Sequence, residues 1–208
     1  KIEEITIEAN PGTLNKEKLR IYKELGINRI SLGVQSLNDQ LLKSIGRIHT
    51  STDFYRSYEL IRNLGFKNVN VDLIFGLPNQ TIGDCQETLE KMVKLQVEHI
   101  SYYSLILEEN TLMNKWYNEG KIKLPNEELE RKMYHDGMKY LKENRYKHYE
   151  ISNFAREGLE CKHNLTYWQI APYIGFGIAA HSNLNQKRFW NFSNFNDYYN
   201  SLDNKRLP

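Results

Sequence analysis

Short apolar runs alternate with amphipathic helical segments through the first half of the chain, and this alternation limits the fold more than any other feature. Strands are expected at residues 4–9, 29–34, 68–75 and 99–106. Between them, apolar residues recur at helical spacing, and Gly26 and Gly65 mark helix ends. Short helices between strands of one sheet imply right-handed crossovers and parallel pairing. The pattern predicts an α/β fold, either a barrel or an open sheet.

The helices that join these strands are expected at residues 14–26, 38–45, 51–64 and 81–96. Thr81 and Asp84 resemble an N-terminal cap for the last of them, and Cys85 lies on its apolar face.

After residue 107 the alternation stops. Helices are expected at 110–119 and 126–144, followed by a short strand at 149–152, a polar loop and an aromatic-rich end. We therefore expect a partial barrel over residues 1–106, and a helical extension with the start of a C-terminal region over residues 107–208.

Composition excludes several classes of protein. The 28 Lys and Arg residues nearly balance the 26 Asp and Glu residues, and no basic patch accompanies the aromatics, so a nucleic-acid partner is not expected. No apolar run approaches the roughly 20 residues that cross a bilayer, and no signal peptide opens the chain. The two cysteines match no disulfide framework, which favours the cytoplasm. The chain starts without methionine and enters a strand at once, so we expect a piece of a longer protein.

Each of the four expected strands ends in polar residues. Glu8, Gln35 and Asp72 close the first three, and residues 101–104 contribute serines to the fourth. In a parallel barrel the carboxyl ends of the strands form one face, where active sites lie. These side chains are therefore expected to converge on one site.

Each of these residues also has a purely structural interpretation. Glu8 could cap the turn at residues 10–12, and the Gln35 amide would by itself be a weak signal for a ribose or amino-acid ligand. Asp72 stands in an apolar strand expected to be buried on both faces, where an acid needs a partner or a ligand. Arg47 could supply that partner, or it could bind a ligand carboxylate.

Seven strings, in this order, carry a family resemblance: TIEANPG, RISLGVQS, GRIHT, DLIFGLP, ISYYSLI, HNLTYW and GFGIAAHS. Together they resemble the radical S-adenosylmethionine family of oxygen-independent coproporphyrinogen III oxidases, and most closely its heme-chaperone branch. The resemblance covers nearly the whole chain and is weakest over residues 107–145.

The resemblance implies an incomplete (β/α)6 TIM-like barrel, with the four strands as its third to sixth. It also implies that Glu8, Gln35, Arg47 and Asp72 bind S-adenosylmethionine. The family holds a [4Fe–4S] cluster through a CxxxCxxC triplet, which is absent from these 208 residues and expected upstream. The fragment alone is therefore expected to be inactive, without metal ligands of its own.

Neither cysteine substitutes for that triplet. Cys85 reads as a small core residue on a helix. Cys161 is expected in a polar loop two residues before His163, where a contact with metal or heme is the less favoured interpretation.

Heme binding is implied by the HNLTYW string, because imidazole is a common axial ligand of heme iron. His163 is the candidate ligand, and a structural histidine in a loop is the alternative. His181, in a glycine-rich stretch that does not match a dinucleotide motif, is a weaker candidate. The other histidines, His99 among them, need no functional account.

Three functional hypotheses follow. The first is a heme chaperone that binds heme and delivers it to a client protein, with S-adenosylmethionine and a cluster in the full-length chain. The second is an oxygen-independent coproporphyrinogen III oxidase, which decarboxylates propionate groups of a porphyrinogen. The third is an ordinary barrel enzyme that uses Glu8 and Asp72 as acid and base. HNLTYW favours the first.

Overall fold

The computed structural model describes residues 2–207, which form two compact units. The first unit ends at Glu160 and the second begins at Cys161. The boundary expected after residue 106 concerns the domains of the complete protein and stays a prediction. Within this chain, the compact unit that holds the sheet continues to Glu160.

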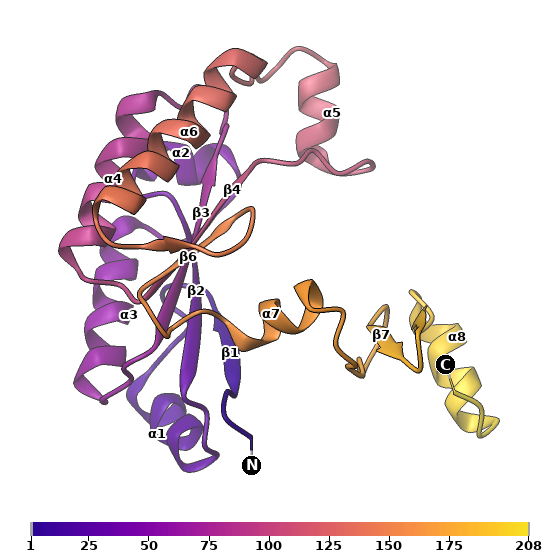
Figure 1. The fold of residues 1–208 in the computed structure, drawn as a ribbon. Coiled ribbons are helices and arrows are strands. Elements are labelled where there is room, and N and C mark those ends of the chain that lie inside the picture. Colours follow the sequence, from indigo (N-terminus) through magenta and orange to yellow (C-terminus); the bar gives the residue numbers. More distant parts are fainter. Residues whose placement is uncertain (1, 208) are drawn as a thin grey trace. The chain divides into compact units, whose positions relative to one another are not determined.

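A six-stranded sheet forms the centre of the first unit (Figure 1). Its parallel part consists, in spatial order, of β1 (Thr6–Ala9), β2 (Arg29–Gln35), β3 (Val69–Phe75) and β4 (His99–Ser104). Two short antiparallel strands follow at the β4 edge, β6 (Asn153–Ala155) and β5 (Lys147–His148). The α/β class and the parallel sheet expected from the strand–helix alternation are therefore confirmed.

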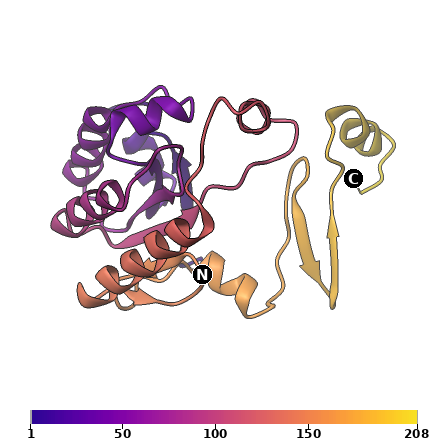
Figure 2. The same ribbon diagram turned by 90° about the horizontal axis from the view of Figure 1, so that it is seen from above.

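Helices join these strands and cover one face of the sheet (Figure 2). They are α1 (Lys16–Glu24), α2 (Asp39–Ser44), α3 (Ser51–Asn63), α4 (Ile82–Lys94) and α6 (Glu127–Glu143). The short α5 (Leu112–Asn118) lies on the connection before α6 and stands away from the sheet. All of these helices lie within the ranges expected from sequence.

Side-chain caps fix where the helices begin and also connect neighbouring loops. The expected cap of α4 is confirmed as a capping box between Thr81 and Asp84. Asp84 also accepts a hydrogen bond of 2.9 Å from Asn38, the N-cap of α2. Asp39, in the first turn of α2, accepts one of 2.7 Å from the backbone N–H of Ser51, where α3 starts. The loops after β2 and β3 are thus joined through their helix caps.

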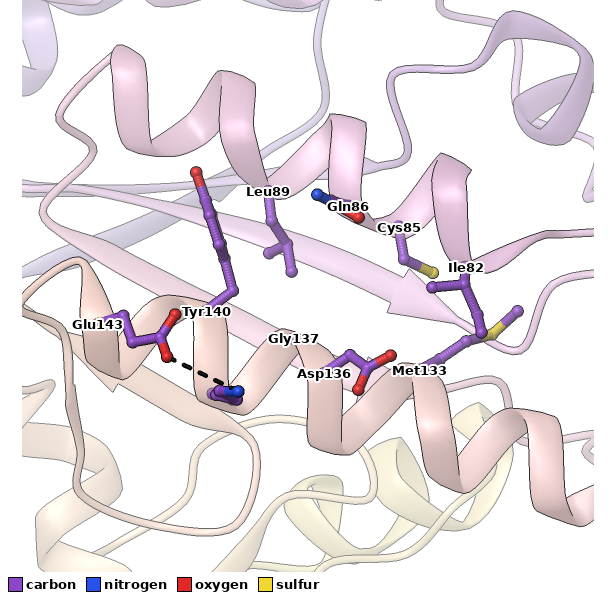
Figure 3. Close-up of a pocket in the computed structure, with 10 residues that line it drawn as sticks. Ile82, Cys85, Gln86, Leu89, Met133, Asp136, Gly137, Tyr140 and Glu143 are labelled. Carbon is purple, nitrogen blue, oxygen red and sulfur yellow. Dashed lines mark ion pairs between the residues drawn. The ribbon is translucent and has the colours of Figure 1, made fainter.

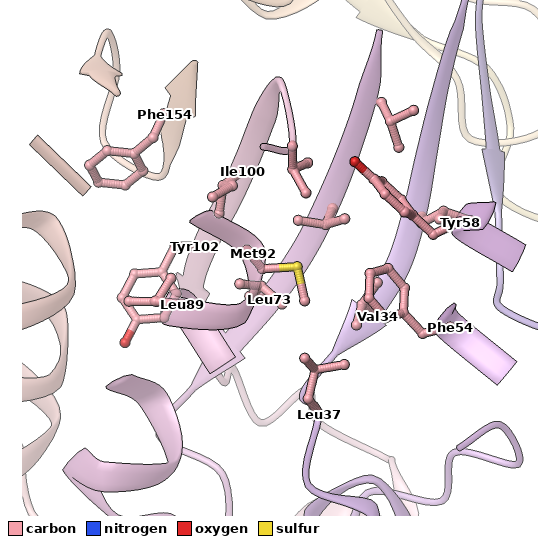
Figure 4. Packing of buried hydrophobic residues seen from close by; sticks show 14 of the residues in the cluster. Val34, Leu37, Phe54, Tyr58, Leu73, Leu89, Met92, Ile100, Tyr102 and Phe154 are labelled. Atoms are coloured by element: carbon pink, nitrogen blue, oxygen red, sulfur yellow. The ribbon is translucent and has the colours of Figure 1, made fainter. Parts of the chain in front are cut away.

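The hydrophobic core lies between the sheet and the helices (Figure 4). Alternate residues of the strands, such as Leu32, Val71 and Ile100, are fully buried there. Phe54 of α3 and Met92 of α4 cover them. This packing accounts for the alternating pattern that identified the strands.

The other face of the same strands is polar. Strand 68–75 was expected to be buried on both faces, and on the face away from the core Asn70 is indeed buried while Asp72 is half-buried. Their cross-strand neighbours are also polar: Asn70 pairs with Ser31 of β2 and His99 of β4. The apolar residues of β3 thus alternate with short polar side chains that bond to one another.

The prediction of a strand at residues 149–152 was wrong. This segment is the turn between β5 and β6, closed by a 3.3 Å hydrogen bond from the N–H of Tyr149 to the carbonyl oxygen of Asn153. The strand residues lie on either side of it.

The second unit is small and built from short elements. They are α7 (Lys162–Trp168), β7 (His181–Leu184), β8 (Lys187–Trp190) and α8 (Phe195–Asp203). Strands β7 and β8 form an antiparallel hairpin whose turn residues, Asn185 and Gln186, both have positive φ, as in a type I′ turn. Across residues 2–207, no helix has the length and apolar character that a membrane span requires.

Candidate functional site

Four of the residues expected at the strand ends line one cavity. The serines of β4 do not line it, and Ser101 instead donates to Asn70. Glu8 comes from β1, Gln35 from β2, Asp72 from β3, and Arg47 from the loop between α2 and α3. The cavity has a volume of about 520 Å³ and lies at the carboxyl ends of the parallel strands. It is mainly polar in its lining. We call it the strand-end cavity.

A bulge in β2 places the Gln35 side chain over this cavity. The register with β3 shifts between Gly33 and Gln35, and Gln35 has a φ of 64°. A Cβ on Gly33 would lie 2.9 Å from Gln35 Nε2 and 3.0 Å from Asn10 Oδ1. Only glycine at position 33 leaves room for both amides, so the GVQ sequence shapes the cavity wall.

Arg47 is held by a neutral partner. Its Nη1 donates a 3.0 Å hydrogen bond to Asn10 Oδ1, and the half-buried guanidinium lines the cavity. A planar cation at a cavity wall is suited to a ligand carboxylate. Of the two roles considered for Arg47, a ligand contact is favoured, because Asp72 takes its hydrogen bonds elsewhere.

Asp72 receives one hydrogen bond on each carboxylate oxygen. Asn70 Nδ2 donates to Oδ1 at 2.8 Å, and Ser31 Oγ donates to Oδ2 at 3.1 Å. The side chain is half-buried and also lines the cavity. A carboxylate oxygen has a second lone pair, so Asp72 can still accept bonds from a ligand.

Tyr103 and Asn10 also line the strand-end cavity, although neither was predicted. The Tyr103 hydroxyl donates to Gln35 Oε1 at 3.3 Å. Burial raises the pKa of Tyr103 to about 12, with the Asp72 carboxylate adding to the rise, so this phenol is a hydrogen-bond donor at neutral pH. Alternation along β4 from Ser101 was the signal that could have identified Tyr103.

A second cavity, of about 540 Å³, lies in the second unit. Its walls include Tyr167 and Ile170 at the end of α7, Tyr173, and His181 and Arg188 of the hairpin. We call it the hairpin cavity. It combines aromatic rings, an imidazole and a guanidinium.

The two candidate histidines have different places relative to the hairpin cavity. His163 lies on α7, so the alternative of a structural histidine in a loop is wrong about its location. Its exposed ring contacts Tyr167 edge-on at 4.7 Å between centroids, and Tyr167 contacts Tyr173 in the same way at 4.6 Å. His181 lines the cavity itself, with its ring 5.7 Å from that of Trp190.

The two cysteines have structural surroundings. Cys85 borders a cavity of about 240 Å³ between α4 and α6, on the helical side of the first unit (Figure 3). Burial raises the pKa of its thiol to about 11, so it stays protonated, as expected of a core residue. Cys161 ends the loop before α7, as expected, where it is the N-cap residue and is buried. Within residues 2–207, no three His, Cys, Asp or Glu side chains form a cluster that could hold a metal ion.

Comparison with known proteins identifies the relatives of this chain. Residues 1–92 match the family model of the Radical SAM superfamily. The chain is 42% identical to the heme chaperone HemW of Bacillus subtilis over 207 residues, which cover 100% of this chain and 55% of that protein. It is 38% identical to HemW of Escherichia coli over 86% of this chain and 46% of that protein. The chain thus spans about half the length of the curated relatives it matches.

A relative from an animal and a solved structure extend the comparison. The chain is 38% identical, over 86% of its length and 40% of the relative, to the mitochondrial radical S-adenosyl methionine domain-containing protein 1 of Bos taurus. The structure of coproporphyrinogen III oxidase HemN from Escherichia coli aligns with a TM-score of 0.80 at 23% identity, over 97% of this chain and 49% of that one. At this identity the likeness shows a common fold, the radical SAM TIM-like fold.

Proposed function

Because residues 1–92 belong to the radical SAM superfamily and the whole chain is homologous to HemW, we propose that the complete protein is a heme chaperone, which binds heme and delivers it to a client protein. The observation that carries this proposal is the 42% identity that runs through both units. The fold likeness to HemN does not by itself support the oxidase alternative.

The strand-end cavity fits S-adenosylmethionine by the chemistry of its walls. Arg47 would bind the carboxylate of the methionine part, and Glu8 would accept from its ammonium group. Asp72 and Gln35 would bind ribose hydroxyls, and the Tyr103 hydroxyl holds the Gln35 amide in place. When bound beside a [4Fe–4S] cluster, S-adenosylmethionine supplies radical chemistry. The cysteines for that cluster are proposed to lie outside this chain, because its own two are structural.

The hairpin cavity is the proposed place for heme in this chain. Aromatic walls suit the flat apolar ring, and Arg188 could pair with a propionate. His163 remains the proposed iron ligand, and His181 is the second candidate because it lines the cavity directly. Client proteins are left open by this arrangement.

Heme titration of the complete protein tests the chaperone proposal. We expect a saturable shift of the Soret band in the wild type, and its loss in His163→Ala. His181→Ala decides whether the second histidine also binds iron. The matched control is His135→Ala, since His135 is an exposed histidine on α6 of the first unit. A Soret shift that survives both His163→Ala and His181→Ala would refute the assignment of heme to this unit.

Equilibrium binding of S-adenosylmethionine tests the first cavity separately. Asp72→Ala and Gln35→Ala should each weaken binding about tenfold or more, because each removes a hydrogen bond to the ligand. Heme affinity should not change. Asp136→Ala is the control, since this exposed carboxylate pairs only with the exposed Lys132. Unchanged nucleoside affinity in both variants would mean that the pocket is misplaced.

A further inference from the structure

A chain of hydrogen-bonded side chains leads from the strand-end cavity into the polar face of the sheet. Starting at Asp72, it passes through Asn70 to His99 and ends at Tyr149. Ser31 contacts both Asp72 and Asn70, so three neighbouring strands and the β5–β6 turn contribute members. We call this set the polar chain.

The Asn70 amide can have only one orientation. The oxygens of the Asp72 carboxylate accept hydrogen bonds, so the group that faces Oδ1 at 2.8 Å must be the Asn70 NH2. The same nitrogen donates to Ser31 Oγ at 2.6 Å. The Asn70 carbonyl oxygen therefore faces the other way, toward His99 and Ser101.

This orientation fixes the tautomer of His99. Its Nδ1 lies 2.6 Å from Asn70 Oδ1, which only accepts, so Nδ1 carries the proton. Nε2 is then the acceptor for the Tyr149 hydroxyl at 2.7 Å. Burial, followed by the nearby Arg29 guanidinium, lowers the pKa of His99 well below its usual value, which keeps the ring neutral.

The polar chain occupies one face of these strands. On the opposite face the same strands carry Leu32, Val71 and Ile100, which pack without polar groups. Burial of each polar side chain in the polar chain has a cost in desolvation free energy. The hydrogen bonds described above offset that cost only when all of them are formed. Two members, Ser31 and Asp72, line the strand-end cavity. Asp72 is the charged one, and both of its carboxylate oxygens accept hydrogen bonds from other members of the polar chain.

We propose that His99 and Asn70 are positioning residues for Asp72. His99 fixes the Asn70 amide, and Asn70 in turn holds one oxygen of the Asp72 carboxylate, which leaves the remaining acceptor sites directed at a ligand hydroxyl. The inference rests on the proposed function only in taking S-adenosylmethionine as that ligand.

Two substitutions of nearly equal size at position 99 separate positioning from packing. Both His99→Leu and His99→Asn remove the ring and its contact with Tyr149. Asparagine can keep an N–H donor close to the place of Nδ1, whereas leucine cannot. We expect the affinity of the complete protein for S-adenosylmethionine to fall about tenfold in His99→Leu, because the buried hydrogen bond to Asn70 is lost. In His99→Asn this bond can form, and the affinity should stay within about threefold of the wild-type value.

One measurement uses the wild-type protein, so it does not depend on whether a substituted protein folds. Nitrogen-15 NMR of His99 should show a protonated Nδ1 and an unprotonated Nε2 at neutral pH, with or without ligand. A protonated Nε2 would overturn the inference, because the Asn70 amide would then be oriented by something else.

Binding outcomes separate this inference from the proposed function. If Asp72→Ala weakens S-adenosylmethionine binding while His99→Leu and His99→Asn bind equally well, the positioning role is wrong and the pocket stands. If Asp72→Ala binds as wild type does, the assignment of the pocket itself fails, and the NMR result still reports on the polar chain.

Discussion

The two units of this chain contain candidate sites of opposite character. In the first, the site residues come from the ends of parallel strands, and Gln35, Arg47 and Asp72 each have a described hydrogen-bond partner. In the second, the candidate site is formed by short elements with large exposed apolar side chains, among them Phe176, Trp190 and Phe195. Among the described residues, the buried hydrophobic side chains all belong to the first unit except Cys161.

This difference indicates that the two proposed ligands require different kinds of binding site. A small polar ligand such as S-adenosylmethionine is selected by a few fixed hydrogen-bonding groups. A flat apolar cargo that must later be released is better served by aromatic surface, since large exposed apolar patches mark interaction sites. The predictions below test whether the two units really behave as separate binding sites.

The largest effect is expected from overpacking the first unit. A Cβ at Gly137 of α6 would lie 2.5 Å from Tyr102 Cε1, and the Tyr102 ring is buried. Gly137→Ala should therefore lower the free energy of unfolding by about 3 kcal/mol, at the upper end for an overpacked core. Urea unfolding checks this.

Gly83→Ala is the matched control, since Gly83 is also helical and its Cβ would meet nothing closer than 3.6 Å. This control should be neutral or slightly stabilising. Equal destabilisation by both alanines would show that the contact with Tyr102 does not set the effect, because alanine favours a helix more than glycine does.

The corresponding change in the second unit should separate the two ligands. A Cβ at Gly175 would lie 2.2 Å from the backbone oxygen of His181, so Gly175→Ala must move the start of β7. We expect heme affinity to fall by about 2 kcal/mol, or roughly thirtyfold, as is typical for overpacking. S-adenosylmethionine affinity should stay at the wild-type value. A parallel loss of both affinities would show that the two sites are not independent.

An acid-sensitive component of stability is expected from His99 in the first unit. Because the pKa of His99 is lowered in the folded state, the unfolded chain binds more protons below its ordinary value of 6.5. The contribution of His99 to the free energy of unfolding is therefore complete above that pH. It is lost as the pH falls below it, and the free energy of unfolding then decreases by up to about 1.4 kcal/mol per pH unit. Unfolding of wild type and His99→Asn, measured in parallel between pH 7 and about 5, should show this slope in the wild type and a smaller one in the variant. Below that range Asp53, Asp84 and Glu160, whose pKa values are lowered in the folded state, add a pH dependence to both proteins.

The smallest effect concerns a single hydroxyl in the strand-end cavity. Tyr103→Phe removes the donor to Gln35 and leaves the ring in place. We expect S-adenosylmethionine affinity to fall by about 1 kcal/mol, close to fivefold, the usual value of a neutral hydrogen bond. Heme titration of the same variant should match the wild type, and a larger change there would contradict the separation of the two sites.

The sequence predicted the strand and helix order of the first unit because its periodicity reports burial of one face. It also placed Glu8, Gln35, Arg47 and Asp72 at one edge, since parallel strands end there together. It missed the partnership of Asn70 with Ser31 and His99, which lie 39 and 29 residues away. Cross-strand register decides such contacts, and one chain read along its length does not reveal register.

Local signals were also weaker in the second unit. The helix at His163 was missed because Lys162–Trp168 is short, and its N-cap, Cys161, makes no side-chain capping bond. The hairpin turn at Asn185 and Gln186 lacks the glycine that normally identifies a type I′ turn. Short elements leave little periodicity from which to predict them.

The bonds between the helix caps of α2, α3 and α4 have a consequence for the timing of local opening. Asn38 is joined to Asp84, and Asp39 to the start of α3, so the loop after β2 does not move without breaking contacts to its neighbours. We therefore expect these caps to open in one concerted event. Hydrogen exchange of the Ser51 and Asp84 amides should then occur at a common rate, and that rate would set an upper limit on any ligand exchange that requires the caps to open.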